Sequence, residues 1–390
     1  MPQTSESERE VVVVTHEYPP FAGGIARYIK SLVDELARAG VPVSVIAPFY
    51  PDEPEPNDTP GVSLIRPLRH HNVTPGIVLR TLMAVRARNR KAFFHAADIR
   101  SAFMLYVAWR LFGIRYGITI HGSEVSKFAG RGLKKRVFSA VYGSADVIFA
   151  NSQATRDIFT ANFGDDADVR VTHLGVDPTW FEPAPSAFES PALAALDDGR
   201  AIVCSVGRID RRKGQLTTLR ALKTGLESGA IGDATYVVAG PVVEEDYAQE
   251  IRQAADLLGV PVVMAGRISE GDLKRLYRQS VCHVLAAVPL EGKIEGFGLV
   301  ILEAAAQSCP TIATRTGGIP EVIAEGETGL ICEVEDVAEL ADAMARLLGD
   351  QALREHMSDA CLAHAERFTW TACMRKTYGD ILPLDGVGAD

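Results

Sequence analysis

The feature that most constrains this chain is the alternation of short, continuously apolar segments with amphipathic segments of helical period. The run Val11–Val14 precedes a glycine-bearing loop and then a helical pattern over residues 25–39. Apolar strands that alternate with helices are typical of a parallel sheet covered on both faces. Further strands of the N-terminal half are predicted over residues 43–47, 117–121 and 147–150. The first half is therefore predicted to be a doubly wound α/β domain.

The same alternation restarts after residues 177–200, a segment rich in Pro, Ala, Ser and Asp. A predicted strand over residues 201–206 leads into a predicted helix over residues 215–227. Further strands of this half are predicted over residues 236–239, 262–265, 281–286 and 311–313. The second half is therefore predicted to be another α/β domain of the same kind.

The predicted fold class is α/β, with two Rossmann-like, doubly wound parallel-sheet domains, which suits a length of 390 residues. We place the first domain in residues 1–185 and the second in residues 186–368. Residues 369–390 are expected to form a C-terminal helix and tail that pack back on the first domain. Ligands of open α/β sheets bind beyond the carboxyl ends of the strands, so we expect the site in the cleft between the two domains.

Charge is distributed unevenly along the chain. The totals of 40 Lys+Arg and 50 Asp+Glu give a net charge of −10, which by itself argues against nucleic acid or an anionic membrane as partner. Residues 1–180 hold 21 Lys+Arg and 18 Asp+Glu, whereas residues 181–390 hold 19 and 32. Within the first half, residues 80–136 contain 13 basic side chains and only two acidic ones, Asp98 and Glu124. The acidic total thus conceals a basic region.

The basic region contains two clusters interleaved with apolar residues, and both are expected on amphipathic helices. The first comprises Arg80, Arg86, Arg88, Arg90 and Lys91, on a helical pattern with Ile77, Leu82, Val85 and Phe93–Phe94. The second comprises Lys127, Arg131, Lys134, Lys135 and Arg136, interleaved with Phe128, Leu133, Val137 and Phe138. Basic amphipathic helices suit an anionic membrane surface, and ordinary solvated helix faces are the alternative. No nucleic-acid-binding motif is recognisable, so nucleic acid is not an expected partner.

Several features predict the cytoplasm as the compartment. The first ten residues are acidic and polar, unlike a secretory signal, and no apolar run approaches the roughly 18–20 residues that span a bilayer. All six cysteines lie in the second half without a C-x-x-C pair, so we expect reduced core residues rather than metal ligands. If the basic region binds lipid, the protein is expected to be peripheral on the inner face of the cell membrane.

Two loops carry residues suited to a phosphorylated sugar. Residues 207–214 follow the first strand of the second half, and their N–H groups together with Arg208 and Lys213 suit a diphosphate; a solvated basic turn is the alternative. Residues 295–303 open a helix, where the carboxylates of Glu295 and Glu303 can accept hydrogen bonds from the diols of a sugar. A nicotinamide dehydrogenase is disfavoured because no G-x-G-x-x-G follows the first strand.

Together these motifs resemble those of the retaining glycosyltransferases of family 4, which have the GT-B architecture of two facing Rossmann-like domains. Glu295 and Glu303 match the Glu-x7-Glu element of that family, and Arg208 and Lys213 match its G-R-x4-K-G loop. Five further elements occur in the family's order: Gly23-Gly24, His121-Gly122-Ser123-Glu124, Asn151-Ser152, His173-Leu174-Gly175-Val176-Asp177 and Thr316-Gly317-Gly318-Ile319-Pro320-Glu321. The resemblance covers nearly the whole chain.

The resemblance implies a role for each matching residue. Arg208 and Lys213 are expected to bind the donor phosphates, Glu295 the transferred sugar and Glu303 the ribose, while His121 lies near the sugar. Further donor contacts are expected at Gly23, Gly24, Ile268, Phe297, Gly298, Leu299 and Val300. Acceptor contacts are expected at His16, Glu17 and Glu124. Relatives often have Pro-Ser where this chain has Ala286-Ala287, followed by a loop with Glu291 and Lys293, and this leaves the shape of the sugar pocket open.

The implied reaction moves a hexose from a nucleotide-diphosphate sugar to an acceptor hydroxyl of a glycan or lipid, with retention. No metal and no other cofactor is expected, since cationic side chains take the place of a metal. The Gly23-Gly24-Ile25 loop is similar to that of GDP-mannose-dependent enzymes acting on membrane lipids, while UDP-glucose and UDP-N-acetylglucosamine remain open as donors. A nucleotide-sugar epimerase or phosphorylase of the same fold is the alternative enzyme, and intact motifs disfavour a non-enzymatic scaffold.

Overall fold

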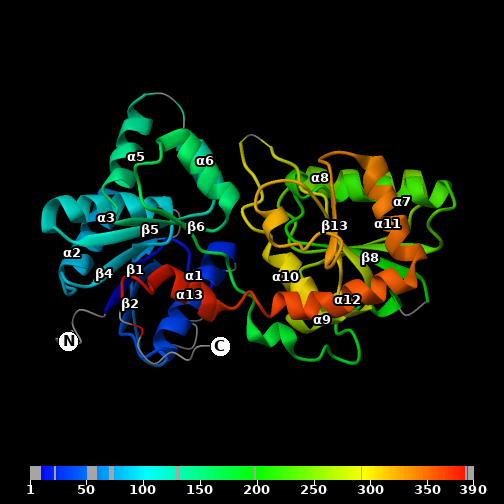
Figure 1. Cartoon of the computed structure of the whole chain (residues 1–390), viewed down its shortest axis with the longest axis horizontal. Helices are drawn as coiled ribbons and strands as arrows, with labels where there is room; N and C mark the ends of the chain where they lie inside the picture. Colours follow the sequence, from blue (N-terminus) through cyan, green and yellow to red (C-terminus); the bar gives the residue numbers. More distant parts are fainter. Residues whose placement is uncertain are drawn as a thin grey trace. The chain divides into compact units, whose positions relative to one another are not determined.

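The computed structural model contains two α/β units, each built on its own parallel sheet (Figure 1). The N-terminal unit comprises residues 1–175 and 370–390, and the C-terminal unit comprises residues 176–369. The structure describes residues 10–21, 23–50, 59–69, 74–128, 130, 132–196, 199–290, 292–382 and 384. Arg131, Glu291, the acidic residues 1–9 and most of the last eight residues, which entered the sequence predictions, lie outside the described residues.

The sheet of the N-terminal unit has seven parallel strands in the order β3-β2-β1-β4-β5-β6-β7. The strands are β1 (Val11–Val14), β2 (Val43–Phe49), β3 (Val62–Arg69), β4 (Phe93–Ala96), β5 (Arg115–Ile120), β6 (Val147–Ala150) and β7 (Val169–Val171). Strand order reverses between β1 and β4, which pair in register from Val11 opposite Phe93 to Val14 opposite Ala96. This is the strand order of a doubly wound fold, as predicted.

Helices cover both faces of this sheet (Figure 1). They are α1 (Gly24–Arg38), α2 (Pro75–Arg86), α3 (Ile99–Phe112), α4 (Ser123–Phe128), α5 (Leu133–Gly143), α6 (Gln153–Phe163) and α13 (Trp370–Tyr378). A buried core that includes Val12, Phe94 and Ile118 from the strands joins one face to α2, α3, α5 and α6. Helix α13 packs beside α1, where the Thr371 hydroxyl donates to the Glu35 carboxylate over 2.7 Å.

The sheet of the C-terminal unit has six parallel strands in the order β10-β9-β8-β11-β12-β13, again with the first strand in the middle. The strands are β8 (Ala201–Val206), β9 (Ala234–Ala239), β10 (Val262–Gly266), β11 (Ser280–Leu285), β12 (Thr311–Thr314) and β13 (Gly329–Cys332). Strand order reverses between β8 and β11, so the two units repeat one topology. The prediction of two Rossmann-like domains is confirmed for the described residues.

The helices of the C-terminal unit also lie on both faces of their sheet (Figure 1). They are α7 (Gln215–Glu227), α8 (Glu245–Leu258), α9 (Glu270–Gln279), α10 (Leu299–Ala306), α11 (Val337–Gly349) and α12 (Gln351–Ala365). Short 3-10 helices are η2 (Pro178–Phe181), η3 (Ala194–Leu196), η4 (Arg211–Lys213) and η5 (Ile319–Glu321). One hydrophobic core joins the sheet to helices α7, α8 and α11, which contribute residues such as Leu219, Ile251 and Met344.

The helical pattern predicted for the first basic cluster is wrong beyond Arg86. Helix α2 ends there, and Asn89 forms a turn in which its side chain accepts the N–H of Lys91 over 3.0 Å. Phe93 and Phe94 then lie in β4, which pairs with β1 and β5. Two adjacent apolar residues fit the period of a helix or that of a strand. Here hydrogen bonding to two neighbouring strands makes the segment a strand. No helix in the described part of the chain is both long enough and apolar enough to span a membrane.

Candidate active site

Most of the predicted site residues follow strands at the reversal of strand order in each sheet, which β1 flanks in one unit and β8 and β11 flank in the other, whereas β5 lies one strand away from it. In the C-terminal unit, β8 leads into the loop with Arg208 and Lys213, and its neighbour β11 leads into the loop with Glu295. In the N-terminal unit, β1 leads to His16 and β5 leads to His121. Crevices beyond the carboxyl ends of strands at such reversals are the usual ligand sites of doubly wound sheets. Topology therefore gathers motifs that are distant in the sequence at one edge of each sheet.

The loop after β8 is held in place mainly through its backbone. The Gln215 side chain donates to the Arg208 carbonyl over 2.9 Å, and the N–H of Lys213 donates to the Asp210 carbonyl over 3.0 Å. The Arg208 side chain is half exposed, with Nη2 3.4 Å from Oδ2 of the buried Asp210. A guanidinium that is tethered by one carboxylate and still reaches solvent can fork onto two phosphate oxygens.

Gly214 brings this loop against the end of β11. Its φ is +67°, and a Cβ there would lie 1.8 Å from the carbonyl oxygen of Ala286. The N–H of Val288 also donates to the Arg212 carbonyl over 2.8 Å. Only glycine tolerates both the left-handed backbone and this close approach. The loop after β8 is thus fastened directly to the loop that carries Glu295.

Lys213 and Glu295 form the central ion pair of this site. Their Nζ and Oε2 atoms lie 2.7 Å apart, and the side chains are only 11% and 16% exposed. Burial alone would raise the pKa of Glu295, but the positive charges of Lys213, Arg212 and Arg208 outweigh it and lower that pKa below its usual value. Glu295 is therefore an ionised acceptor, suited to the hydroxyls of a sugar.

The glycine turn after β12 fixes the backbone of Glu295. The N–H of Gly318 donates to the Glu295 carbonyl over 3.0 Å. Gly317 has a φ of +55°, and a Cβ there would lie 1.9 Å from the same carbonyl oxygen. The sequence resemblance included this turn but gave no role to its glycines. Their role in the structure is to let the turn support Glu295.

Helix α10 begins beside Glu295. Gly298 precedes its first residue with a φ of +90°, and a Cβ there would lie 2.9 Å from the Ile301 side chain, so conformation and packing both favour glycine. The first N–H groups of an α-helix, here those of Leu299 and Val300, have no acceptor within the helix and suit an anion. Glu303 is buried one turn further on. Phe297 is buried, with its ring centroid 6.2 Å from that of Phe368, so its side chain packs in the interior of the unit.

Ile268 lies two residues beyond the end of β10 and is half-buried. Strand β10 is separated from β8 by β9 alone in the sheet order. The N–H of Gly240, after β9, donates to the Gly266 carbonyl over 2.7 Å, and a Cβ at Gly240 would lie 1.9 Å from the Gly207 carbonyl oxygen. Two close backbone approaches therefore link the region of Ile268 to the phosphate loop.

In the N-terminal unit, the glycine loop precedes α1. A Cβ at Gly23 would lie 2.7 Å from the Phe21 ring and 3.1 Å from Oε2 of Glu17, whereas a Cβ at Gly24 has no neighbour within 4 Å among the described residues. A side chain at Gly23 would therefore displace the Phe21 ring or the Glu17 carboxylate. Gly24 leaves an open approach to the start of α1, and Glu17 lies beside the loop as the sequence order predicts.

The His121 ring is held at the end of β5. Its Nε2 lies 2.9 Å from the Ala97 carbonyl oxygen, so that nitrogen is the donor. The His121 N–H donates to the carboxylate of Glu124, in the first turn of α4. This bond ties the first turn of α4 to the residue that follows β5, which gives Glu124 a structural task besides the predicted acceptor contact.

His16 is fully buried at the end of β1. Its N–H donates to Oδ2 of Asp98 over 2.7 Å, and its Nδ1 lies 3.3 Å from Oδ1 of Asp98 and 3.1 Å from the Ser101 hydroxyl. Burial would raise the pKa of Asp98, but these hydrogen bonds and the His16 charge hold it well below its usual value. Asp98 also caps α3, and the sequence analysis gave it no role; an aspartate before an apolar helical run was the available signal.

No metal site is expected from the sequence. Within the described ranges, no group of three or more His, Cys, Asp and Glu side chains has a geometry that could hold a metal ion. All six cysteines are buried and unpaired, and burial raises the pKa of the Cys282, Cys332, Cys361 and Cys373 thiols, which makes them inert core residues.

The family of this chain is shown by its similarity to known proteins. Residues 188–361 match a family model described as glycosyl transferases group 1, and residues 22–180 match one described as glycosyltransferase family 4. A GDP-mannose-dependent alpha-(1-6)-phosphatidylinositol monomannoside mannosyltransferase of Mycobacterium tuberculosis is 30% identical over 361 residues, which cover 87% of this chain and 89% of the relative. The chain belongs to glycosyltransferase family 4.

Other relatives of this family 4 glycosyltransferase carry related names. A D-inositol 3-phosphate glycosyltransferase of Acidothermus cellulolyticus is 29% identical over 378 residues, covering 90% of this chain and 83% of the relative. Among solved structures, a sucrose-phosphate synthase of Thermosynechococcus elongatus superposes with a TM-score of 0.79 at 21% identity, covering 97% of this chain and 100% of that one. The GT-B fold class is therefore confirmed, and the protein is a hexosyltransferase that acts on a nucleotide sugar.

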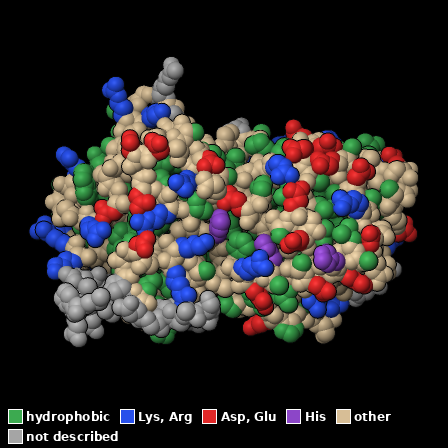
Figure 2. All heavy atoms as spheres, viewed as in Figure 1, with side chains coloured by type: hydrophobic (Ala, Val, Ile, Leu, Met, Phe, Trp, Pro, Cys, Tyr) green, Lys and Arg blue, Asp and Glu red, His purple; other side chains and the backbone are tan. Residues whose placement is uncertain are grey.

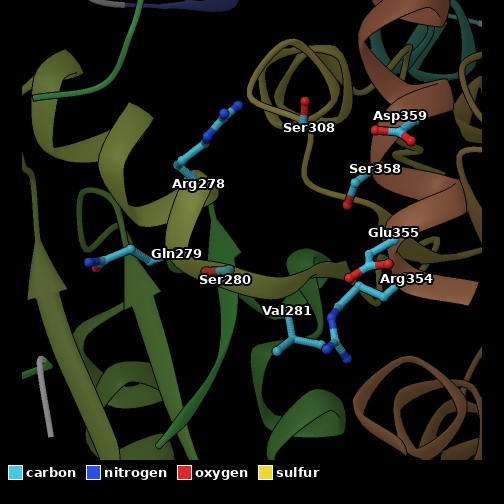
Figure 3. Close-up of a pocket in the computed structure, with 9 residues that line it drawn as sticks. All are labelled: Arg278, Gln279, Ser280, Val281, Ser308, Arg354, Glu355, Ser358 and Asp359. Atoms are coloured by element: carbon cyan, nitrogen blue, oxygen red, sulfur yellow. The ribbon is translucent and has the colours of Figure 1, made fainter. Parts of the chain in front are cut away.

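A separate hollow of about 470 Å³ lies in the C-terminal unit of this glycosyltransferase, away from the residues above. It borders Ser280 and Val281 at the start of β11, whereas Glu295 follows the end of that strand. Figure 3 shows Ser358 pointing toward the hollow from one side, with Arg278 on the opposite side and Arg354 next to Val281. None of the predicted site residues lines it. Its position at the amino end of the sheet separates it from the expected chemistry.

Proposed function

We propose that this protein is a retaining transferase that moves mannose from GDP-mannose to a hydroxyl of a lipid-linked acceptor. The observation that carries the proposal is the largely buried Lys213–Glu295 pair in the loops that follow β8 and β11, at the reversal of strand order. The choice of donor and acceptor is supported by the names of relatives, such as the GDP-mannose-dependent mannosyltransferases acting on a phosphatidylinositol monomannoside.

In the proposed reaction, Lys213 and Arg208 bind the donor diphosphate and stabilise the negative charge that builds on it as the glycosidic bond breaks. The N–H groups of Leu299 and Val300 add a positive helix end. Glu295 accepts hydrogen bonds from the sugar, and Glu303 accepts them from the ribose. Attack on the same face as the leaving group, with a donor phosphate oxygen taking the acceptor proton, gives retention without a protein nucleophile.

The donor is tested by thermal shift with UDP, GDP and ADP, followed by their sugars. GDP and GDP-mannose are expected to raise the melting temperature most. Proton NMR of the product formed early in the reaction is expected to show the anomeric configuration of the donor. A larger shift with UDP would replace the proposed donor, and an inverted product would refute retention. Conversion of the donor into an epimeric nucleotide sugar without acceptor, with no net release of nucleoside diphosphate, would favour an epimerase.

The phosphate and ribose roles are tested by substitution. Arg208→Ala should lower kcat by roughly a hundredfold or more, because a preorganised charge at the leaving group is lost. Arg220→Ala is the matched control, since Arg220 is exposed on α7 outside the site. Glu303→Ala should weaken GDP binding by calorimetry with a smaller effect on kcat. Unchanged turnover in Arg208→Ala would contradict the phosphate assignment.

We propose in addition that no metal takes part, because Lys213 and Arg208 supply the positive charge that a divalent cation would supply. Turnover is expected to persist in excess EDTA after dialysis. Loss of activity on EDTA treatment, restored by Mg²⁺ or Mn²⁺ at catalytic concentrations, would overturn this part of the proposal.

The basic region supports a membrane-proximal acceptor. Large apolar side chains are exposed next to basic ones on adjoining helices of the N-terminal unit: Leu79 and Met83 beside Arg80 on α2, Leu111 beside Arg110 on α3, and Leu133 beside Lys134 on α5. Figure 2 shows Lys and Arg side chains projecting from the outer part of this unit. We propose that this surface binds anionic lipid, because apolar insertion and basic charge together favour such a membrane.

Co-sedimentation with phosphatidylglycerol-containing vesicles tests the surface. The wild-type protein is expected to bind at low salt and to be released at high salt, since charge attraction is screened. Leu79→Gln with Met83→Gln should reduce binding. Leu257→Gln is the matched control, because Leu257 is 86% exposed on α8 of the other unit. Absence of wild-type binding at low salt would refute the membrane role.

A further inference from the structure

A buried chain of hydrogen bonds runs from α13 to β5, the strand that directly precedes His121. The hydroxyl of Tyr378, in α13, lies 2.6 Å from Nδ1 of His95, in β4. Nε2 of His95 lies 2.7 Å from the Thr119 hydroxyl, in β5, and that hydroxyl lies 3.1 Å from the Tyr28 hydroxyl, in α1. All four residues are at most 1% exposed. Elements distant in the sequence thus share one polar network inside an apolar layer.

A neutral His95 satisfies the network, and burial favours that form. Burial first, and then the charge of His121, lowers the pKa of His95 to about 3. The neutral ring accepts at one nitrogen and donates at the other, so every link from Tyr378 to Tyr28 can have one donor and one acceptor. A fully paired buried network is rigid, because breaking any link leaves a polar atom without a partner.

Tyr28 connects this network to His121. Its ring meets the His121 ring edge to face, with centroids 5.6 Å apart and planes 80° apart. The other side of Tyr28 contacts the Trp370 indole, at the start of α13, with centroids 6.1 Å apart. His121 itself is half-buried and is held through Nε2 by the Ala97 carbonyl. The orientation of its ring therefore depends on Tyr28 as well as on one hydrogen bond.

We propose that Tyr28 and Tyr378 are positioning residues, which hold the His121 ring in one orientation and make α13 part of the machinery of sugar transfer. The inference rests on the proposed function and on the expectation from the family resemblance that His121 lies near the transferred sugar. Tyr28 excludes other ring rotations by packing, and Tyr378 holds Tyr28 through His95 and Thr119. Reactions of bound groups are sensitive to displacements of about 1 Å, so loosening this ring should slow transfer more than it weakens donor binding.

Three variants test the positioning role. Tyr28→Leu removes the edge-to-face contact, and Tyr378→Phe removes only the hydroxyl that begins the network. Tyr116→Phe is the matched control, because Tyr116 is a fully buried tyrosine of β5 whose hydroxyl donates to the Val141 carbonyl, in the core on the other face of the sheet. Each variant is examined for melting temperature, for kcat and donor KM with GDP-mannose, and by long-range proton–nitrogen NMR of the His121 ring.

Tyr28→Leu is expected to lower kcat by about tenfold or more with donor KM changed by less than about twofold. Its His121 ring signals should lose the single form protonated at Nε2. Tyr378→Phe should show the same changes to a smaller degree, and Tyr116→Phe should lose stability while keeping kcat and the ring signals. Rescue of kcat in Tyr28→Phe, which keeps the ring, would support packing as the main contribution.

Two outcomes would overturn the inference. Unchanged His121 signals in Tyr28→Leu would show that Tyr28 does not hold the ring, whatever the turnover. Altered signals with unchanged kcat would show that the orientation does not affect transfer. Failure of the proposed function is distinct from both, because it appears as wild-type turnover in His121→Ala or as absence of mannose transfer by the unsubstituted protein.

Discussion

The Nζ atom of Lys213 lies 2.7 Å from Oε2 of Glu295, although 82 positions separate the two residues. The pair joins the loops that follow two neighbouring strands, β8 and β11. It lies mostly inside the unit, where a lone charge is costly, so each residue depends on the other for its ionised form. The same two side chains are those that the proposed reaction uses for phosphate and sugar.

Removing one partner of this pair should destabilise the protein more than removing both. Lys213→Met leaves the Glu295 carboxylate buried and is expected to lower the free energy of unfolding by about 3 kcal/mol at pH 7. The double variant with Glu295→Gln should recover most of that loss. Lys223→Met, which breaks an exposed pair with Glu227 on α7, is the control and should change stability by less than about 0.5 kcal/mol. Urea unfolding is measured for the wild type, the two single variants, the double variant and Lys223→Met, and additive effects of Lys213→Met and Glu295→Gln would contradict the coupling.

The same variant should reverse the pH dependence associated with Glu295. In the wild type its lowered pKa gives stability that is present above the pKa of the unfolded state and is lost as pH falls. Without Lys213, burial dominates and raises the pKa of Glu295, so the defect of Lys213→Met should shrink as pH falls from 7 to 5. A defect that stays constant over this range would contradict the assignment of cause.

Gly317 should tolerate no side chain. Gly317→Ala places a Cβ against the Glu295 carbonyl, whereas Gly326→Ala adds a Cβ to open space at a φ of +82°. Gly326→Ala is expected to lose about 1–2 kcal/mol from the left-handed backbone alone. Gly317→Ala should lose about 1–3 kcal/mol more and also lower kcat, because the backbone of Glu295 has to move. Equal losses of stability would indicate that the close approach does not matter.

Replacing Ser308 by glycine should stabilise the folded protein. It follows the C-terminus of α10 with a φ of +57°, a conformation that serine adopts at a cost. Ser308→Gly is expected to raise the free energy of unfolding by about 1 kcal/mol. Ser228→Gly, at the C-cap of α7 with a φ of −75°, is the matched control and should lower it by about 0.5–1 kcal/mol. A loss of stability in Ser308→Gly would give the Ser308 hydroxyl a role that outweighs backbone strain.

Two buried histidines should make the protein less stable in mild acid. Burial is the main cause that lowers the pKa of His95 and His283 to about 3, with a further contribution from His121 and Lys213 respectively. Because the unfolded chain binds these protons near pH 6.5, stability should fall as pH drops from about 6.5 toward 3, by about 1.4 kcal/mol per pH unit for each histidine. His283→Gln should reduce the slope, and ring NMR titration with a midpoint near 6.5 would contradict the prediction.

Much of the fold followed from pattern alone. The runs Val11–Val14 and Val147–Ala150 have the predicted bounds, because central parallel strands are apolar on both faces and resemble little else. Strands β3, β4, β7 and β13 were not predicted. Strand β3 lies at the sheet edge and shows no strict alternation, since Leu64 and Ile65 are adjacent, and β4 is a four-residue segment whose two phenylalanines fit a helical period as well. Neighbouring strands decide such segments.

Candidate site residues could be named from the sequence where a residue type has a recognisable chemical property. Lys213, Arg208 and the glycines before α10 carry charge or conformational freedom that can be recognised in a loop between strand and helix. The ion pair with Glu295 was not predictable, since it depends on β8 and β11 lying side by side. Nor could the sequence show that Gly317 supports Glu295, or that Phe297 is buried against Phe368.

The sequence by itself determined the alternation of strand and helix, the two repeated α/β halves and the residue types available at the strand ends, because these depend on local periodicity and chemistry. Only the tertiary structure decided which strand ends are neighbours, which charges neutralise one another and how α13 reaches His95. Those contacts join residues up to 283 positions apart, and their energies depend on burial and on distances of a few ångströms, which no local pattern encodes.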